Sequence, residues 1–429
     1  MDKETAKIKK WLDKRFTMGV KEGKYFAHQP IYGYKKGLTE GRELIRYIRT
    51  LSNLKKISQF KFDNFIDVGG AEGYTANLVK KIFNVNTYTC DLSYQANLRA
   101  KELFGLDSVA VDLSNLPFKD GAFDIVLCSE VLEHVTKPVQ AIYELKRIAK
   151  KALLITTEAI CYDKLERKLR MLLVDLSEEH ADRNWYLVDD FALVIGENIN
   201  YENTIPDISS INKPNCTLKE IKTILEEQDK LGSFTRDGLG ISILFVKEHD
   251  MASNKIDTIT FIDTILNTAI SEEYNKNKTS VHLQNKLLDM LYCPKCLTAI
   301  KKDTNGLICS MCNERYRINQ GIPLMYTNVS DKIYLEEKWN RIYMNALKSN
   351  YKNVAQLIKL LEHTKVKSNP LIRIIARRIL KVKKFMYNTN KDLNKRSIGS
   401  AFVYFLKKII QKIQREIDRL INRLRENKN

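Results

Sequence analysis

The sequence predicts an α/β fold with a parallel β-sheet, followed by a small cysteine-rich β module and a basic helical tail. Short apolar runs alternate with segments of helical periodicity from about residue 64 onward, which is typical of a parallel sheet with helices on both faces. Two Cys-x-x-Cys pairs follow, and Lys and Arg accumulate after residue 364. A chain of 429 residues is too long for one hydrophobic core, so we expect two or three domains.

The elements follow in chain order. Residues 1–60 are expected to be mainly helical, with an aromatic loop in which His28, Tyr32 and Tyr34 are candidates for a lid. Apolar runs that predict strands are Phe65–Val68, Thr87–Cys90, Val109–Val111, Phe123–Cys128, Ala152–Ile155 and Ile241–Val246. A helix is expected over Tyr74–Phe83. The expected segments are 1–60 (helices and lid), 61–250 (sheet domain), 251–285 (linker with a helix), 286–327 (cysteine module) and 328–429 (basic tail).

The composition excludes a disordered chain and a chain that crosses a membrane. Hydrophobic residues make up 44% and charged residues 29%, as in globular proteins. No run approaches the ~20 apolar residues that a transmembrane helix needs. The first residues lack the apolar segment of a secretory signal, so a cytoplasmic protein is expected.

The strongest local motif is the small-residue turn after the run that ends at Val68. Gly69, Gly70 and Gly73 let the backbone turn tightly and approach a ligand. Asp91 lies eighteen residues after Gly73, where an acidic side chain can accept hydrogen bonds from ribose hydroxyls. Taken alone, this pattern fits any nucleotide-binding fold of this class, including a dinucleotide dehydrogenase.

Two later blocks narrow the choice. Leu116–Phe118 follows the third predicted strand, and Ser129–Val135 follows the fourth. With the order and spacing of all the blocks, residues 60–160, and more weakly those up to 247, resemble the Rossmann-like small-molecule superfamily of S-adenosylmethionine (SAM)-dependent methyltransferases. A dehydrogenase is not expected to carry these two blocks.

The resemblance implies a seven-stranded sheet in which Ile241–Val246 lies inside the final hairpin. It also implies a set of SAM-binding residues: Asp67, Gly69, Gly70, Ala71 and Gly73 beside the methionine part, Asp91 and Leu92 at the ribose, Asp112 and Leu113 at the adenine, and Ser129 beside the sulfonium. Ala71 departs from the pattern, because the family has a glycine there. A methyl group is a small intrusion, so SAM remains the expected cofactor.

Two histidines are candidates for proton transfer. Methyl transfer is an in-line displacement, and a hydroxyl acceptor also needs a general base. His134 closes the block after the fourth strand, and His180 lies in a charged, aromatic insertion where the family places substrate-recognition residues. The alternatives are that His134 is family scaffolding and that His180 lies in a surface loop.

The cysteine pairs predict a zinc ribbon. Cys293 and Cys296 are separated by twelve residues from Cys309 and Cys312, which suits a short hairpin. Four thiolates form a closed tetrahedral zinc site without an open position for catalysis. Disulfides are the alternative, disfavoured in a reducing compartment.

The sequence around the cysteines is informative as well. From Leu287 to Met325 it resembles small zinc-ribbon proteins that bind and activate methyltransferases, which implies a docking or stabilising role. Methyltransferases of ribosomal RNA also carry ribbons, so RNA stays an alternative substrate.

The tail holds most of the net charge of +19. Residues 365–429 carry 19 Lys and Arg against 4 Asp and Glu, whereas the other 364 residues carry 52 against 48. Apolar residues recur in the tail at helical spacing between the basic ones. This pattern fits an anionic membrane surface, a stripe packed on the protein itself or in a coiled coil, or RNA.

These observations predict an O-methyltransferase of a cell-surface glycan, a glycolipid or a secondary-metabolite precursor, peripheral on the inner membrane face. The alternatives are a tRNA or rRNA methyltransferase and a non-enzymatic zinc-ribbon adaptor. The sequence does not predict an oligomeric state.

Overall fold

The computed structural model describes residues 1–17, 20–21, 24–25, 41–161, 166–167, 170, 181–196, 199–203, 217–230, 240–252, 256–269, 285–304, 306–327 and 333–350. These residues fall into two units, Met1–Ile160 with Val188–Ile333 and Cys161–Leu187 with Tyr334–Asn429. The candidate lid residues His28, Tyr32 and Tyr34, the candidate base His180 and the basic tail 365–429 lie outside the described residues.

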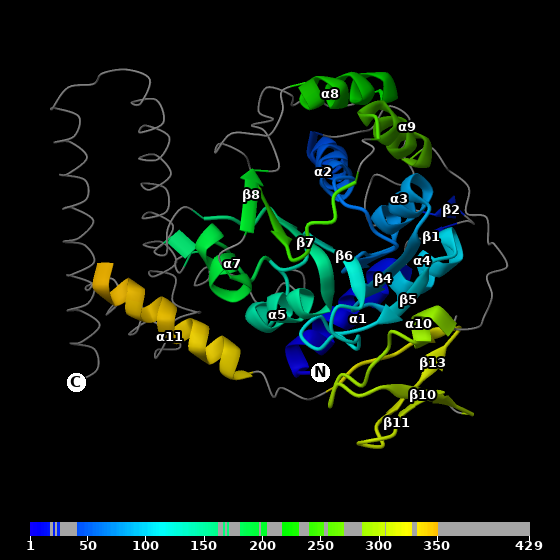
Figure 1. Cartoon of the computed structure of the whole chain (residues 1–429), viewed down its shortest axis with the longest axis vertical. Helices are drawn as coiled ribbons and strands as arrows, with labels where there is room; N and C mark the ends of the chain where they lie inside the picture. The colour runs from blue at the N-terminus through cyan, green and yellow to red at the C-terminus, as the bar shows by residue number, and fades with distance from the viewer. Residues whose placement is uncertain are drawn as a thin grey trace. The chain divides into compact units, whose positions relative to one another are not determined.

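A seven-stranded sheet forms the centre of the first unit (Figure 1). Its strands are β3 (Asn64–Val68), β4 (Asn86–Asp91), β5 (Asp107–Ala110), β6 (Phe123–Ser129), β7 (Ala149–Thr157), β8 (Ile199–Asn203) and β9 (Ile241–Val246). Their order is β5-β4-β3-β6-β7-β9-β8. The first five are parallel, and β9 runs antiparallel between β7 and β8. The predicted α/β sheet with β9 inside its last hairpin is therefore confirmed.

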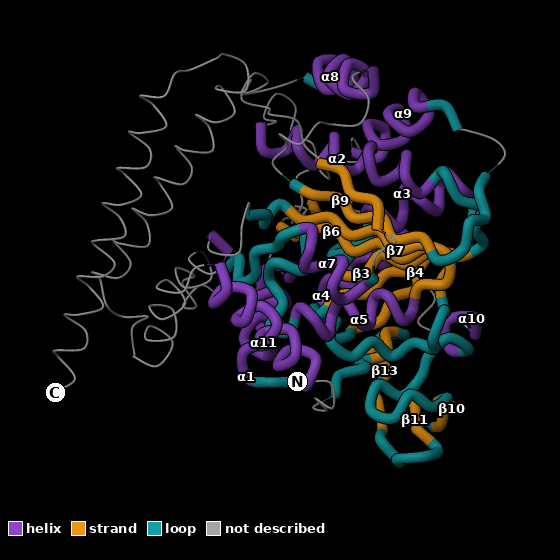
Figure 2. Tube along the Cα trace, turned by 60° about the vertical axis from the view of Figure 1, so that its left-hand side comes forward, coloured by secondary structure: helices purple, strands orange, loops and turns teal. Residues whose placement is uncertain are grey.

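Helices cover both faces of the sheet (Figure 2). The described helices of the first unit are α1 (Lys3–Thr17), α2 (Gly41–Ile57), α3 (Tyr74–Phe83), α4 (Tyr94–Phe104), α5 (Pro138–Ile148), α7 (Val188–Ile195), α8 (Leu218–Lys230) and α9 (Thr258–Ala269), together with the short α10 (Asn285–Leu288) at the start of the cysteine module. Local chemistry sets their ends. The Ser93 hydroxyl accepts a hydrogen bond from the Ala96 amide at the start of α4, and Gly105 ends that helix with φ +60°.

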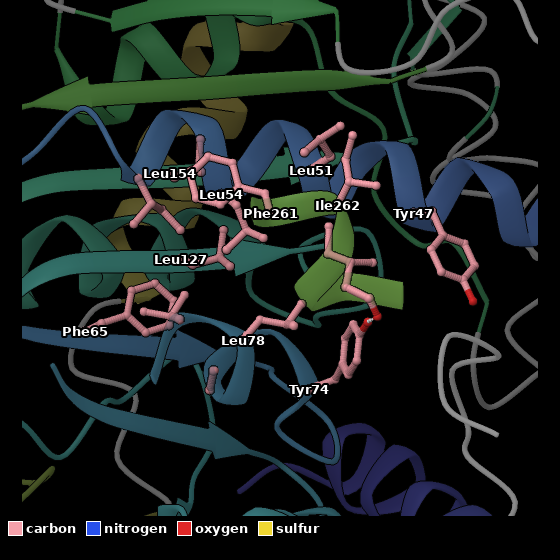
Figure 3. Close-up of a cluster of buried hydrophobic side chains, with 14 of the residues drawn as sticks. Tyr47, Leu51, Leu54, Phe65, Tyr74, Leu78, Leu127, Leu154, Phe261 and Ile262 are labelled. Atoms are coloured by element: carbon pink, nitrogen blue, oxygen red, sulfur yellow. Dashed lines mark hydrogen bonds between the residues drawn. The ribbon is translucent and has the colours of Figure 1, made fainter. Parts of the chain in front are cut away.

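The main hydrophobic core lies between the sheet and a layer of helices (Figure 3). Leu54 of α2 and Leu78 of α3 are fully buried with Phe65 and Leu127 of the sheet. Phe261 of α9 is buried in the same cluster. The helix that was expected within the linker 251–285 is α9, and it contributes to the core of the sheet domain.

The cysteine module (residues 285–327) is a set of short strands. β10 (Ile300–Asp303), β11 (Gly306–Cys309) and β12 (Arg315–Tyr316) form an antiparallel sheet, and β13 (Ile318–Asn319) pairs with β14 (Ile322–Pro323). The module contacts the main sheet beside its β5 edge (Figure 1). The Met325 amide donates to the Ala110 carbonyl at 2.9 Å, and the Tyr292 amide donates to the Pro117 carbonyl at 2.8 Å.

The second unit contains α11 (Ile333–Asn350) and part of the charged insertion. Within it, the Arg167 guanidinium lies 3.8 Å from the ring centroid of Trp339, and that of Arg170 lies 4.2 Å from the centroid of Trp185. Cation–π contacts of this kind stabilise the packing of the insertion's basic side chains on Trp339 of α11 and on Trp185 of the insertion itself. Among the described helices of the chain, none combines the length and the apolarity that crossing a bilayer requires.

Candidate active site and metal centre

The loop after β3 is shaped by glycine. Gly69 and Gly73 have φ of 78° and 80°, a region that residues with a Cβ rarely adopt. A Cβ on Gly70 would lie 2.4 Å from the Thr89 hydroxyl oxygen and 2.9 Å from the Asp67 carboxylate. The loop therefore has no room for side chains at these positions, and its backbone comes close to the carboxyl ends of β3 and β4.

Ala71 has φ +49°, an uncommon conformation for a residue with a Cβ. Its side chain is buried with Phe16 of α1 and Ala96 of α4, and the partly buried Leu12 packs against this group. The methyl group that departs from the family pattern thus contacts α1, which covers the glycine loop. The sequence predicted a helical N-terminal segment but not this contact.

Asp67 and Asp91 place two carboxylates at the ends of β3 and β4. Burial, together with the charge of Asp91, raises the pKa of Asp67 to about 7. Burial also raises the pKa of Asp91, to about 6, although the Ser93 and Ala71 amides donate hydrogen bonds to it at 2.8 and 3.1 Å. Such carboxylates can accept hydrogen bonds from hydroxyls or pair with a cationic ligand.

Asp112 and Leu113 follow β5 and are buried. Both hydrogen bonds that Asp112 accepts from Ser114, at 3.0 and 2.7 Å, go to Oδ1. The Asp91 carbonyl accepts from the Val111 amide, which ties the ends of β4 and β5 together. The residues predicted for ribose and adenine therefore gather at one edge of the sheet, as expected for ligands of open α/β sheets.

A polar cluster lies at the carboxyl ends of β6 and β7. The Ser129 and Thr156 hydroxyl oxygens are 2.7 Å apart. Glu130 has φ +57° and accepts a hydrogen bond from the Glu158 amide at 3.0 Å. Arg49 of α2 approaches Glu130 to 3.3 Å and also donates to Glu158.

Sequence reasoning did not single out Arg49, Glu130 or Glu158. Glu130 lies inside the block after β6, and strained backbone of this kind concentrates at functional sites. Arg49 carries no local signal, because α2 brings it to the site from a distant part of the chain.

Glu133 and His134 stand beside this cluster. Glu133 is buried and accepts a hydrogen bond from the Thr157 hydroxyl at 3.1 Å. Burial and the charge of Glu130 raise its pKa well above the ordinary value. The His134 Nε2 atom lies 4.0 Å from the Glu133 carboxylate. Of the two predicted histidines, His134 is thus placed beside a buried acid.

The four predicted cysteine ligands form one cluster. Their sulfur atoms all lie within 4.8 Å of one another, and all four are free thiols. Sulfur separations are 3.6 Å for Cys293 to Cys312, 3.4 Å for Cys296 to Cys309 and 3.7 Å for Cys296 to Cys312. Tetrahedral zinc with Zn–S bonds of ~2.3 Å separates its sulfur ligands by about 3.8 Å, so the donor set fits this metal.

Known proteins resemble two parts of the chain. The family described as a methyltransferase domain matches residues 66–155. The uncharacterised protein MJ0638 of Methanocaldococcus jannaschii is 27% identical over 201 residues, which cover 46% of this chain and 83% of that protein. A UPF0434 protein of Methylobacillus flagellatus is 40% identical over 55 residues, which cover 12% of this chain and 92% of that protein.

Solved structures are similar at lower identity. A SAM-dependent methyltransferase of Thermotoga maritima is 17% identical with a TM-score of 0.34, covering 48% of this chain and 92% of that one. A chain from the complex of the Haloferax volcanii Trm112 methyltransferase activator is 13% identical with a TM-score of 0.34, covering 58% and 99%. Over 55 residues the chain belongs to the family of the UPF0434 protein. Because its residues 66–155 match the methyltransferase domain, the chain is a SAM-dependent methyltransferase.

Proposed function

We propose that this enzyme is an O-methyltransferase that acts on a cell-surface glycan, a glycolipid or a secondary-metabolite precursor. SAM would lie across the carboxyl ends of β3, β4 and β5. The proposed contacts are Asp67, Gly69, Gly70, Ala71 and Gly73 with the methionine part, Asp91 and Leu92 with the ribose, Asp112 and Leu113 with the adenine, and Ser129 beside the sulfonium. SAM supplies the methyl group when it is bound.

The observation that supports a hydroxyl acceptor is a histidine, His134, 4.0 Å from the buried Glu133 in the block that follows β6. A hydroxyl must lose its proton as it attacks the methyl group, whereas an amine with a free lone pair need not. Burial and the charge of Glu130 raise the pKa of Glu133 and favour its protonated form, so Glu133 is not proposed as the base. His134, whose Nε2 atom lies 4.0 Å from the Glu133 carboxyl group, is the proposed base, and because it is partly exposed it can pass the proton to solvent.

The surrounding cluster favours a polyhydroxylated acceptor. Ser129 supplies a partly exposed hydroxyl, held by the buried Thr156, and the Arg49–Glu130 and Arg49–Glu158 pairs supply fixed charges at the same strand ends. Sugars are recognised by such dense sets of donors and acceptors, because each buried hydroxyl needs a hydrogen-bond partner. His180 is kept as a second proposed base.

Transfer of labelled methyl groups from SAM tests this function. Lipid-linked glycans, polar metabolites and total RNA are offered as acceptors, and mass spectrometry identifies the methylated atom. His134→Asn removes the proposed base and is expected to lower kcat by about 100-fold or more with unchanged affinity for S-adenosylhomocysteine. Glu248→Gln, an exposed control change, is expected to have no effect. A product methylated on nitrogen, or full activity of the His134→Asn variant, would contradict the proposal.

RNA is the second candidate, favoured by the charge of residues 365–429. Labelled tRNA or rRNA, together with co-purifying nucleic acid that high salt removes, would replace the glycan proposal. The adaptor alternative is not retained, because the methyltransferase domain makes the chain an enzyme.

We also propose that residues 365–429 bind an anionic membrane surface. The full chain should sediment with vesicles containing phosphatidylglycerol but not with phosphatidylcholine vesicles, and less so at high salt. Changing Arg415, Arg419 and Arg423 to glutamine should weaken sedimentation. Equal sedimentation with both lipids would remove the membrane proposal.

The cysteine cluster is proposed to hold one structural zinc ion through Cys293, Cys296, Cys309 and Cys312. Metal analysis of the purified chain should give one zinc per chain, and Cys309→Ser should lower that content and the melting temperature. Four thiols that stay unreactive until a chelator is added would agree with zinc. Disulfides resistant to chelation would contradict it.

A further inference from the structure

The segment that leaves the cysteine module runs parallel to the edge strand β5. Leu324 forms a parallel bridge with Ala110, and the Met325 amide donates to the Ala110 carbonyl. Met325 is fully buried, which fixes this register. Because the two segments run in the same direction, the next residue, Tyr326, lies at the carboxyl end of the sheet.

Tyr326 is thereby placed among the carboxylates of the cofactor site. Its phenol donates a hydrogen bond of 2.7 Å to the carbonyl of Leu92, the residue directly after Asp91. Burial, with the nearby charges of Asp13, Asp91 and Asp112, raises the pKa of the phenol. The ring is therefore neutral at physiological pH and lies close to both carboxylates proposed to hold adenosine.

The N-terminal helix α1 holds the ring from another side. The Lys9 ammonium group lies 5.3 Å from the Tyr326 ring centroid. Asp13, four residues further along α1, accepts a hydrogen bond from the Ser93 hydroxyl at 2.6 Å. The ring is thus fixed by α1, by the turn after β4 and by the module, yet it remains half-buried. An oriented, half-buried aromatic ring of this kind can pack against a purine.

We propose that Tyr326 is a cofactor-binding residue and that the cysteine module forms one wall of the adenosine pocket. The inference rests on the SAM orientation proposed above, not on the acceptor. It gives the module a role in cofactor affinity beyond docking. Loss of the module's fold, for example on removal of its metal, would then weaken SAM binding without touching any residue of the sheet domain.

Calorimetric titration with S-adenosylhomocysteine and with 5′-methylthioadenosine tests the proposal on full-length protein. Tyr326→Ala should lower the affinity for both ligands by about tenfold, since stacking of an aromatic side chain on a base contributes roughly 5- to 150-fold to affinity. Tyr326→Phe keeps the ring and should stay within about threefold. A similar loss for both ligands locates the contact on the adenosine part that they share.

Tyr292→Ala is the matched control, because Tyr292 is also half-buried and belongs to the same module but contacts the domain at Pro117. It should leave both affinities unchanged. Equal weakening by Tyr292→Ala and Tyr326→Ala would show a loosened module and overturn the inference. Unchanged affinity in Tyr326→Ala would overturn it too. A wild type that binds neither ligand would overturn the cofactor assignment, and the inference with it.

Discussion

Replacing Gly73 with alanine tests whether the loop after β3 is restricted to glycine by its packing. The backbone at Gly73 has φ +80°, and the left-handed conformation costs a residue with a Cβ roughly 1–2 kcal/mol. The new Cβ would lie 2.7 Å from Leu106 Cδ1 and 2.9 Å from Ala100 Cβ. Both neighbours are fully buried, so overpacking adds about 1–3 kcal/mol. The free energy of unfolding should fall by about 2–5 kcal/mol in all.

Gly105→Ala separates the two contributions. Gly105 also has a positive φ, +60°, but a Cβ there would meet nothing within 4 Å. This variant should lose only the backbone contribution of about 1–2 kcal/mol. Urea denaturation followed by circular dichroism, compared at equal m-values, measures both losses. Equal losses in the two variants would refute the packing argument, and a loss below ~1 kcal/mol for Gly73→Ala would refute the strain argument as well.

Three further predictions concern single side chains. Asp91→Asn removes a charged acceptor and should weaken S-adenosylhomocysteine binding by about 10- to 100-fold in calorimetry; an unchanged affinity would remove Asp91 from the site. The pKa values of Asp67 (about 7) and Asp91 (about 6) are raised in the folded protein, so between pH 4 and 7 the folded state keeps protons that the unfolded chain has lost. The melting temperature of the ligand-free protein should therefore fall from pH 4 to 7 and then level off. A rise in the melting temperature over this window would contradict the raised pKa values. Arg147→Lys leaves the carbonyls of Leu116 and Phe118 without their guanidinium donor and should cost about 2–4 kcal/mol in urea denaturation, whereas a loss within ~0.5 kcal/mol would show that water or lysine replaces it.

Elements with strong local patterns were predicted well. The apolar run Ile241–Val246 matches β9 residue for residue, and the helix expected over Tyr74–Phe83 is α3. β8, Ile199–Asn203, was not predicted, because its sequence INYEN has only two apolar residues, which is too short an alternation to indicate a strand. This strand is defined by pairing with β9, a tertiary contact that no short window contains.

The residues of the candidate site likewise include some that local sequence predicts and some that it does not. Motif residues such as Asp91 and Asp112 are local features of strand ends, so their positions could be predicted. Arg49 reaches Glu130 and Glu158 only because α2 packs on the sheet near the ends of β6 and β7. Long-range packing likewise determines the contact of Phe16 with Ala71 and the hydrogen bond from the Tyr326 phenol to the Leu92 carbonyl. Periodicity and spacing carry no information about such contacts.

The attachment of the cysteine module to β5 has a consequence for binding thermodynamics. The module is joined covalently to the domain on which it lies, so its docking is a unimolecular equilibrium. A short covalent connection gives an effective concentration of the order of 1 mM. At that value, an interface with an intrinsic dissociation constant of about 10 μM would be closed in roughly 99% of molecules. A few backbone hydrogen bonds and buried side chains such as Met325 and Leu291 are then sufficient, where two separate chains would need a much larger surface.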